Sequence, residues 1–139
     1  MITIALTIAA LLATEPVPAQ DGVVRQQLAE ADQLVVGKAN GTGIQGFGDL
    51  NEGDQANVTL SLRPGRQYFI VGVCDEDCSD LDLTASNSSG STLDSDLEMD
   101  DVPLLTFAAD VTGRVTLNIS MEGCGVEPCG YGYRVYVAN

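Results

Sequence analysis

The stretch RVTLNISM, residues 114–121, alternates apolar and polar side chains at every position. Val115, Leu117, Ile119 and Met121 fall on one side of an extended chain, and the polar residues fall on the other. Successive side chains of a β-strand point to opposite faces, so this period of two predicts a strand with one buried and one solvated face. Strands of this kind build antiparallel sheets that cover a core on one side.

Segments on both sides of this strand have similar patterns. The stretch ANVTLSL, residues 56–62, alternates in the same way, and QYFIVGVC, residues 67–74, is apolar on both faces, as a central strand would be. Further strands are predicted at LDL (81–83), PLLTFAAD (103–110) and YGYRVYVAN (131–139). Turn residues such as those of RPGR and SNSSG separate the strands. The sequence therefore predicts an all-β fold, an antiparallel β-sandwich of about seven to eight strands.

One helix is predicted before the strands, over residues 22–36. Its apolar residues recur at intervals of three and four, the spacing of one helix face: Val24, Leu28, Ala31 and Val35. The following GKANGTG, residues 37–43, contains three glycines and predicts a linker or turn. We therefore expect a helix and glycine-rich linker over residues 20–43 and a β-sandwich domain over residues 44–139.

The N-terminal residues have the pattern of a secretory signal peptide. The apolar run ITIALTIAALLA, residues 2–13, is short for a bilayer span, and VPA, residues 17–19, provides small residues before a cleavage position. We expect a signal peptide over residues 1–19, cleaved after Ala19. No Lys or Arg precedes the apolar run, and a membrane-anchored N-terminus is the alternative. The prediction is a periplasmic or secreted protein that has no membrane segment after cleavage.

The composition argues against several classes of function. Six basic residues stand against 20 acidic ones, a net charge of −14, and removal of Glu15 with the signal peptide leaves 6 − 19 = −13. Such a charge disfavours nucleic acid and anionic membranes as partners. The chain has no histidine, so no catalytic triad with an imidazole base can form, and a non-enzymatic protein is expected. A hydrolase that works through paired carboxylates is the alternative.

Four cysteines in an exported chain predict two disulfides, for which three connectivities exist. Three residues lie between Cys74 and Cys78, and four residues lie between Cys124 and Cys129. Because a disulfide has a short reach and both intervals contain turn-forming or flexible residues, local pairing within each pair is favoured. Neither spacing is that of a thiol oxidoreductase, and a zinc site is not expected in an oxidising compartment.

Acidic residues are concentrated next to the first cysteine pair, in CDEDCSDLDL, residues 74–83. Ten acids and no basic residue lie between Asp75 and Asp101. Calcium takes about six to eight oxygen ligands in flexible geometry, which two acidic loops together could provide. The candidate ligands are Asp75, Asp77, Asp80, Asp82, Asp96, Asp100 and Asp101. No EF-hand loop is present, and a solvated acidic surface is the alternative.

The succession from LSLRPGRQYFIVGVC through SDLDL and DVTG to RVTLNISM, followed by the closing strand, resembles the bacterial pre-peptidase C-terminal domain. The resemblance covers about residues 55–138 and implies a jelly-roll sandwich. Domains of this family usually accompany secreted proteases and similar enzymes, and some relatives bind calcium or extracellular polymers. The present sequence shows no catalytic domain, and two cysteine pairs are unusual for the family.

These observations lead to one expected function. The protein is expected to be a secreted or periplasmic, non-catalytic binding or accessory module, stabilised by disulfides and by calcium if a site forms. Its expected partner is a protein or an extracellular polymer. A third alternative, besides the carboxylate-dependent hydrolase, is an inhibitory or structural partner of a secreted enzyme.

Overall fold

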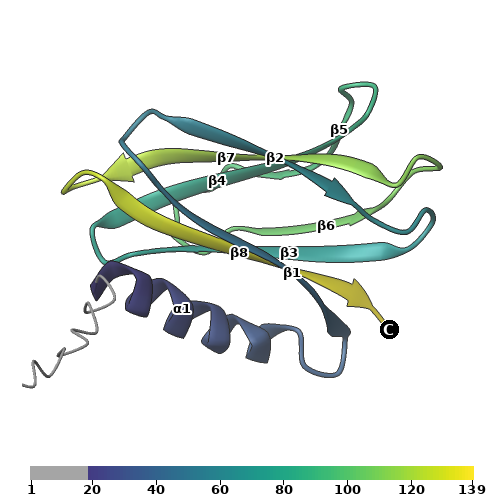
Figure 1. Cartoon of the computed structure of the whole chain (residues 1–139), viewed down its shortest axis with the longest axis horizontal. Helices are drawn as coiled ribbons and strands as arrows, with labels where there is room; N and C mark the ends of the chain where they lie inside the picture. The colour runs from purple at the N-terminus through teal and green to yellow at the C-terminus, as the bar shows by residue number, and fades with distance from the viewer. Residues whose placement is uncertain (1–18) are drawn as a thin grey trace, which may run out of the picture.

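A computed structural model describes residues 19–139 of the chain (Figure 1). The predicted signal peptide lies outside these residues, apart from Ala19. The elements are α1 (Ala19–Ala31), the 3-10 helix η1 (Asp32–Leu34), β1 (Ala39–Leu50), β2 (Gln55–Ser61), β3 (Gln67–Cys74), β4 (Cys78–Asn87), β5 (Thr92–Asp96), β6 (Leu104–Ala108), β7 (Arg114–Cys124) and β8 (Cys129–Ala138).

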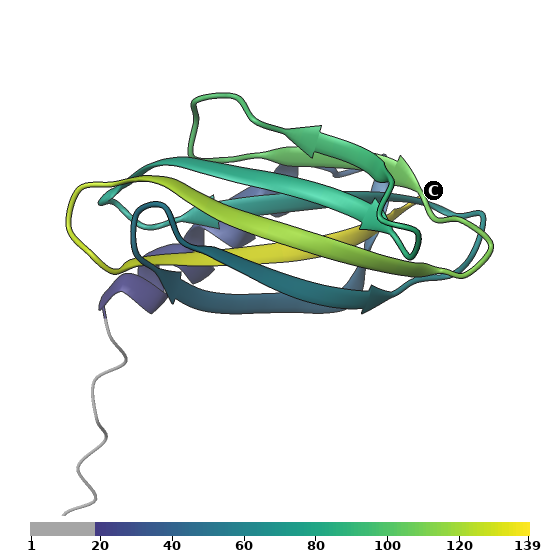
Figure 2. The same cartoon turned by 90° about the horizontal axis from the view of Figure 1, so that it is seen from above.

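The eight strands form two antiparallel sheets that lie face to face (Figures 1 and 2). The first sheet has the order β1-β8-β3-β6, and the second sheet has the order β2-β7-β4-β5. The strand order shows that successive connections repeatedly pass from one sheet to the other, which is the connectivity of an eight-stranded jelly roll. The predicted fold class is therefore confirmed.

The main core lies between the two sheets and contains the residues that the alternating pattern placed there. On β7, Val115, Leu117, Ile119 and Met121 are all buried, and the polar residues between them face outward. Leu81 is paired with Met121 across β4 and β7, so the two inward rows meet in register. Burial of these side chains provides most of the favourable free energy of such a fold.

The helix α1 covers the outer face of the first sheet and makes a second, smaller core (Figure 1). Val24 and Leu28 are buried there against Val71 and Val73 of β3. Gly132 of β8 lies beneath the helix, where a Cβ atom would come within 2.8 Å of Val24 Cγ1. The predicted apolar face of the helix is confirmed, and the doubly apolar pattern of β3 follows from its position between two cores.

A polar contact fixes the end of the helical segment to the same sheet. Asp32 accepts hydrogen bonds from Arg134 Nη1 at 2.8 Å and from the Tyr136 hydroxyl at 2.5 Å. Burial alone would raise the pKa of Asp32, but the hydrogen bonds from Tyr136 and Arg134 outweigh it, so its pKa is lowered. Asp32 is therefore a charged anchor between η1 and β8.

The glycine-rich segment is a strand, which corrects the predicted linker. β1 begins at Ala39 and continues to Leu50, so most of residues 37–43 and the first residues of the sandwich belong to one edge strand. Further along β1, Gly46 and Gly48 have no room for a side chain, because a Cβ atom would lie 2.5 Å from the Tyr133 ring and 2.5 Å from the Tyr131 hydroxyl oxygen, respectively. These tyrosine side chains of β8 cover the two glycines. A prediction from local turn residues cannot detect this contact between strands.

Candidate functional site

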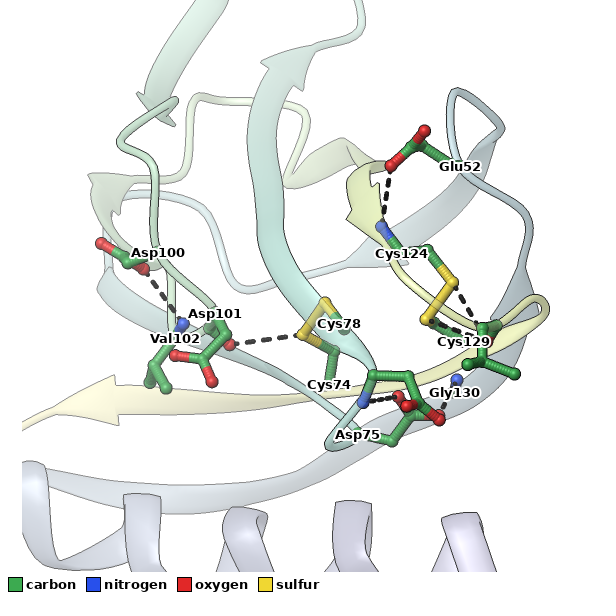
Figure 3. Close-up of a disulfide and its surroundings, with 12 residues drawn as sticks. Glu52, Cys74, Asp75, Cys78, Asp100, Asp101, Val102, Cys124, Cys129 and Gly130 are labelled. Atoms are coloured by element: carbon green, nitrogen blue, oxygen red, sulfur yellow. Dashed lines mark hydrogen bonds between the residues drawn. A yellow bond between two sulfur atoms is a disulfide. The ribbon is translucent and has the colours of Figure 1, made fainter.

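Both predicted disulfides form, and both lie at one end of the sandwich (Figure 3). Cys74–Cys78 joins β3 of the first sheet to β4 of the second, and Cys124–Cys129 joins β7 of the second sheet to β8 of the first. Cys78 and Cys124 are direct partners across β4 and β7. We call the two connections, residues 74–78 and 124–129, the stapled end, because each disulfide ties the two sheets together there.

Asp75 joins the first connection of the stapled end to the start of β8, directly after Cys129 (Figure 3). Its side chain is buried, with 2% of the residue exposed, and it accepts hydrogen bonds from Gly130 N at 2.6 Å and from Asp77 N at 3.1 Å. Its own backbone N–H donates to Gly130 O at 3.0 Å. These contacts give Asp75 a structural role in the stapled end, although its carboxylate was predicted as a metal ligand.

Asp80, Asp82 and Glu122 form a group that we call the acidic face, on the outer side of the second sheet. Leu81 points into the core, so its neighbours Asp80 and Asp82 on β4 point outward on the same side. Glu122 extends from the neighbouring β7 strand, where its Oε1 accepts a hydrogen bond from Ser120 Oγ at 2.5 Å. Three carboxyl groups therefore share one region of the sheet surface.

The carboxyl groups of the acidic face are partly buried and repel one another. Partial burial, followed by the charges of Asp80 and Glu122, raises the pKa of Asp82 to about 6. Burial and the charge of Glu122 also raise the pKa of Asp80. The Oδ1 atom of each aspartate is buried and has no donor in residues 19–139 other than the neighbouring carboxyl group. A hydrogen bond between the two carboxyl groups lowers the pKa of Asp80 and raises that of Asp82. Such oxygens favour either a shared proton or a bound cation.

Two further predicted ligands border the acidic face. Asp96 contributes to the raised pKa of Asp82, and Asp100 contributes to that of Asp80. One carboxylate oxygen each of Asp96, Glu98 and Asp100 lies within 4.8 Å of the others. Asp96 also accepts hydrogen bonds from Glu98 N at 3.2 Å and from Leu104 N at 2.9 Å. The carboxylate of Asp96 therefore combines a loop-capping role with its place beside the acidic face.

The carboxylates of β5 also close one edge of the sandwich. Asp94 accepts a hydrogen bond from Thr106 N at 2.7 Å, as Asp96 does from Leu104 N. β5 and β6 are edge strands of different sheets, so these bonds connect the sheets where no backbone ladder does. The free amides of an edge strand are a liability for aggregation, and the two aspartates satisfy them.

The structure groups the predicted ligands differently from the sequence analysis. It brings Asp80, Asp82, Asp96 and Asp100 to one region, and it directs Asp75 toward Gly130 at the start of β8. Asp77 and Asp101 are exposed, and their described contacts involve backbone atoms, such as that of Asp77 O with Gly125 N at 2.8 Å. Glu122 was missed because it is distant in sequence; only the pairing of β4 with β7 brings it to Asp82.

The pairing of the cysteines indicates the type of compartment in which the protein folds. Two disulfides and no free cysteine in the described residues indicate an oxidising environment, extracellular or periplasmic. Within residues 19–139, no helix has both the length and the apolar character needed to cross a membrane.

Comparisons with known proteins identify no family. No family model matches the chain, and no curated protein matches it. Among solved structures, the P-domain of Macrobrachium rosenbergii nodavirus is similar at 18% sequence identity, over 72% of this chain and 89% of that chain, with a TM-score of 0.39.

Proposed function

We propose that the protein is an exported, non-catalytic binding or accessory module, a relative of the pre-peptidase C-terminal domain. The jelly-roll connectivity supports the relationship, and the disulfides that tie the two sheets together support export. The observation that carries it is the structural role of three aspartates. Asp75, Asp94 and Asp96 bind backbone amides and hold loops and strand edges together, which is a structural use and not a catalytic one.

Calcium binding to the acidic face is part of this proposal. The buried oxygens of Asp80 and Asp82, which have no donor outside this pair in residues 19–139, are the observation that fits a cation, because a divalent ion would neutralise the repulsion that raises their pKa values. Glu122 and Asp100 are the neighbouring oxygen donors. Calcium suits such a set because it accepts several carboxylates in irregular geometry, whereas magnesium requires a stricter arrangement.

Thermal unfolding tests the calcium part of the proposal. Millimolar calcium should raise the melting temperature more than sodium at equal ionic strength, because a ligand bound only to the folded state stabilises it. Asp80→Asn with Asp82→Asn should remove the calcium-specific shift. Glu30→Gln, a change at an exposed position of α1, should retain it. Equal shifts with both ions, or a calcium shift that survives in the double variant, would contradict a site at the acidic face.

A carboxylate-dependent hydrolase is the second candidate, favoured by one observation. Asp82, with a pKa of about 6, lies next to a second carboxyl group, and such a pair can divide the roles of acid and base. The test is hydrolysis of glycoside, ester and peptide substrates by the purified chain. Turnover that is lost in Asp82→Asn would establish the enzyme and overturn the non-catalytic proposal, whereas equal rates for both proteins would trace any turnover to a contaminant.

A further inference from the structure

A pocket lies at the end of the sandwich opposite the stapled end. It has a volume of about 380 Å³ and is lined by residues at the beginning of β1, at the β2–β3 turn and at the end of β8. These three segments lie at the same end of the sandwich in Figure 1. Ile44, Leu62 and Val137 provide apolar walls. The volume is within the range of small-molecule sites in proteins, which begin at about 300 Å³.

Two arginines line this pocket although the chain is strongly acidic. Arg63 and Arg66 are two of only six basic residues in a protein with 20 acids. In residues 19–139, neither arginine lies within 4.0 Å of a carboxylate oxygen, and the ion pair that the structure contains is Arg134–Asp32. Asp110, in the adjacent β6–β7 turn, instead accepts hydrogen bonds from Thr112. The guanidinium groups at the pocket therefore lack an anionic partner within the described chain.

The polar groups of the pocket are mainly hydrogen-bond donors. Arg66 Nη2 donates to Ala138 O at 3.3 Å, which leaves its other N–H groups available. Tyr68 is 3% exposed, and its hydroxyl accepts a hydrogen bond from Arg63 N at 2.8 Å. The hydroxyl hydrogen of Tyr68 has no acceptor among the described residues. Tyr68 therefore keeps a hydroxyl proton that it can donate to a group bound in the pocket.

We propose that this pocket, which we call the arginine pocket, binds a small organic carboxylate with an apolar chain. The carboxylate would accept hydrogen bonds from Arg63, Arg66 and Tyr68, because the planar guanidinium matches a carboxylate in shape and charge. The apolar chain would lie against Ile44, Leu62 and Val137. The source of the carboxylate is either a free short-chain acid or the C-terminus of a peptide, and both present the same chemistry.

Calorimetric titration of the full mature chain with hexanoate tests the chemistry of the site. Hexanoate should bind at least roughly tenfold more tightly than acetate, which lacks the apolar chain, and than hexanol, which lacks the charge. Inorganic phosphate should bind more weakly than hexanoate because it has no apolar chain. Equal affinity for hexanoate and hexanol, or tighter binding of phosphate than of hexanoate, would overturn the proposal.

Variants test the location of the site. Arg63→Gln and Arg66→Gln should each weaken hexanoate binding roughly tenfold, the usual effect of removing a charged hydrogen-bond donor. Tyr68→Phe should also weaken it. Arg25→Gln, a loss of the same charge from α1, where Arg25 stacks on Phe47, should leave affinity unchanged. Melting curves confirm that each variant folds. Unchanged affinity in both Arg63→Gln and Arg66→Gln would contradict the proposal.

A pair of peptides identifies the source of the carboxylate. A short apolar peptide with a free C-terminus is compared with the same peptide carrying a C-terminal amide. Tighter binding of the free peptide than of hexanoate, lost on amidation, supports the proposal and assigns the pocket to peptide C-termini. Binding of hexanoate without binding of the peptide supports it and assigns the pocket to small acids. Equal binding of both peptides would show that no carboxylate is recognised and would overturn the proposal.

Discussion

The two ends of this jelly roll are held together in different ways. At the stapled end, two disulfides connect the sheets, and the buried carboxylate of Asp75 joins the first connection to the start of β8. At the opposite end, backbone hydrogen bonds such as Leu62 N to Gly113 O, at 2.7 Å, hold the β2–β3 and β6–β7 turns together. The comparison shows that crosslinks are found where acidic residues crowd, while the end without crosslinks has arginines with no carboxylate partner.

Removal of the disulfides should lower the stability of the protein more than any other change to either end. Chain-entropy reasoning gives about 2 kcal/mol for each short loop, so loss of both should lower the free energy of unfolding by about 4 kcal/mol. Melting curves with and without reductant measure the loss. Mass spectrometry of the native protein should show no free thiol, and a peptide that links Cys74 to Cys124 would contradict the pairing described above.

Substitution of Asp75 should have the next largest effect. Asp75→Ala leaves Gly130 N and Asp77 N without their charged acceptor, at a cost of about 2 to 3 kcal/mol. Chemical denaturation measures this change. Asp77→Ala alters an exposed side chain in the same loop and should change stability by less than about 0.5 kcal/mol. Similar losses in the two variants would mean that the buried hydrogen bonds of Asp75 are not what joins the first connection to β8.

The acidic face should make stability depend on pH. Because the pKa of Asp82 is raised to about 6 in the folded protein, the folded state holds more protons than the unfolded state between about pH 4 and pH 6. Stability without calcium should therefore fall as the pH rises through this window. Asp82→Asn should stabilise the protein by about 1 to 2 kcal/mol at pH 7.5 and give no gain at pH 3.5.

The control for this pH dependence is Asp101→Asn, at an exposed position in the β5–β6 loop. It removes the same charge from a residue outside the acidic face. Denaturation in the presence of a calcium chelator should give the parent pH profile for Asp101→Asn and a flatter one for Asp82→Asn. Matching profiles for both variants would show that general charge repulsion, and not the acidic face, sets the pH dependence.

The arginine pocket should contribute least to stability. Arg63 and Arg66 are exposed and have no ion pair within the described residues, so Arg63→Gln and Arg66→Gln should each change the free energy of unfolding by less than about 0.5 kcal/mol. Chemical denaturation again provides the measurement. A loss comparable to that of Asp75→Ala would mean that the arginines hold the turns together, and the contrast between the two ends would disappear.

The sequence predicted features that depend on near neighbours. The alternation of RVTLNISM identified β7 because strand geometry acts between adjacent residues, and the short cysteine spacings favoured the disulfides that form. β1 was missed because Gly41 and Gly43, near its start, resemble a linker. The side chains of Tyr131 and Tyr133, distant in sequence, explain only Gly46 and Gly48, further along the strand.

The candidate sites were less predictable because both depend on pairing between distant segments. Asp80 and Asp82 were recognised, but Glu122 joins them through the register of β4 and β7. Arg63 and Arg66 were read only as part of a turn, and the pocket needs β1 and the end of β8 beside that turn. Local patterns contain no information about such distances.

The central claim is that the acidic face, beside the stapled end, and the arginine pocket, at the opposite end, have separate roles, and amide NMR spectra of one labelled sample test it most directly. Calcium should shift the resonances of residues near the acidic face, in segments 80–82, 96–100 and 120–122. Hexanoate should shift those around the arginine pocket, in segments 42–44 and 61–68. Shifts from both ligands in the same set of residues, or hexanoate shifts confined to the stapled end, would contradict the claim.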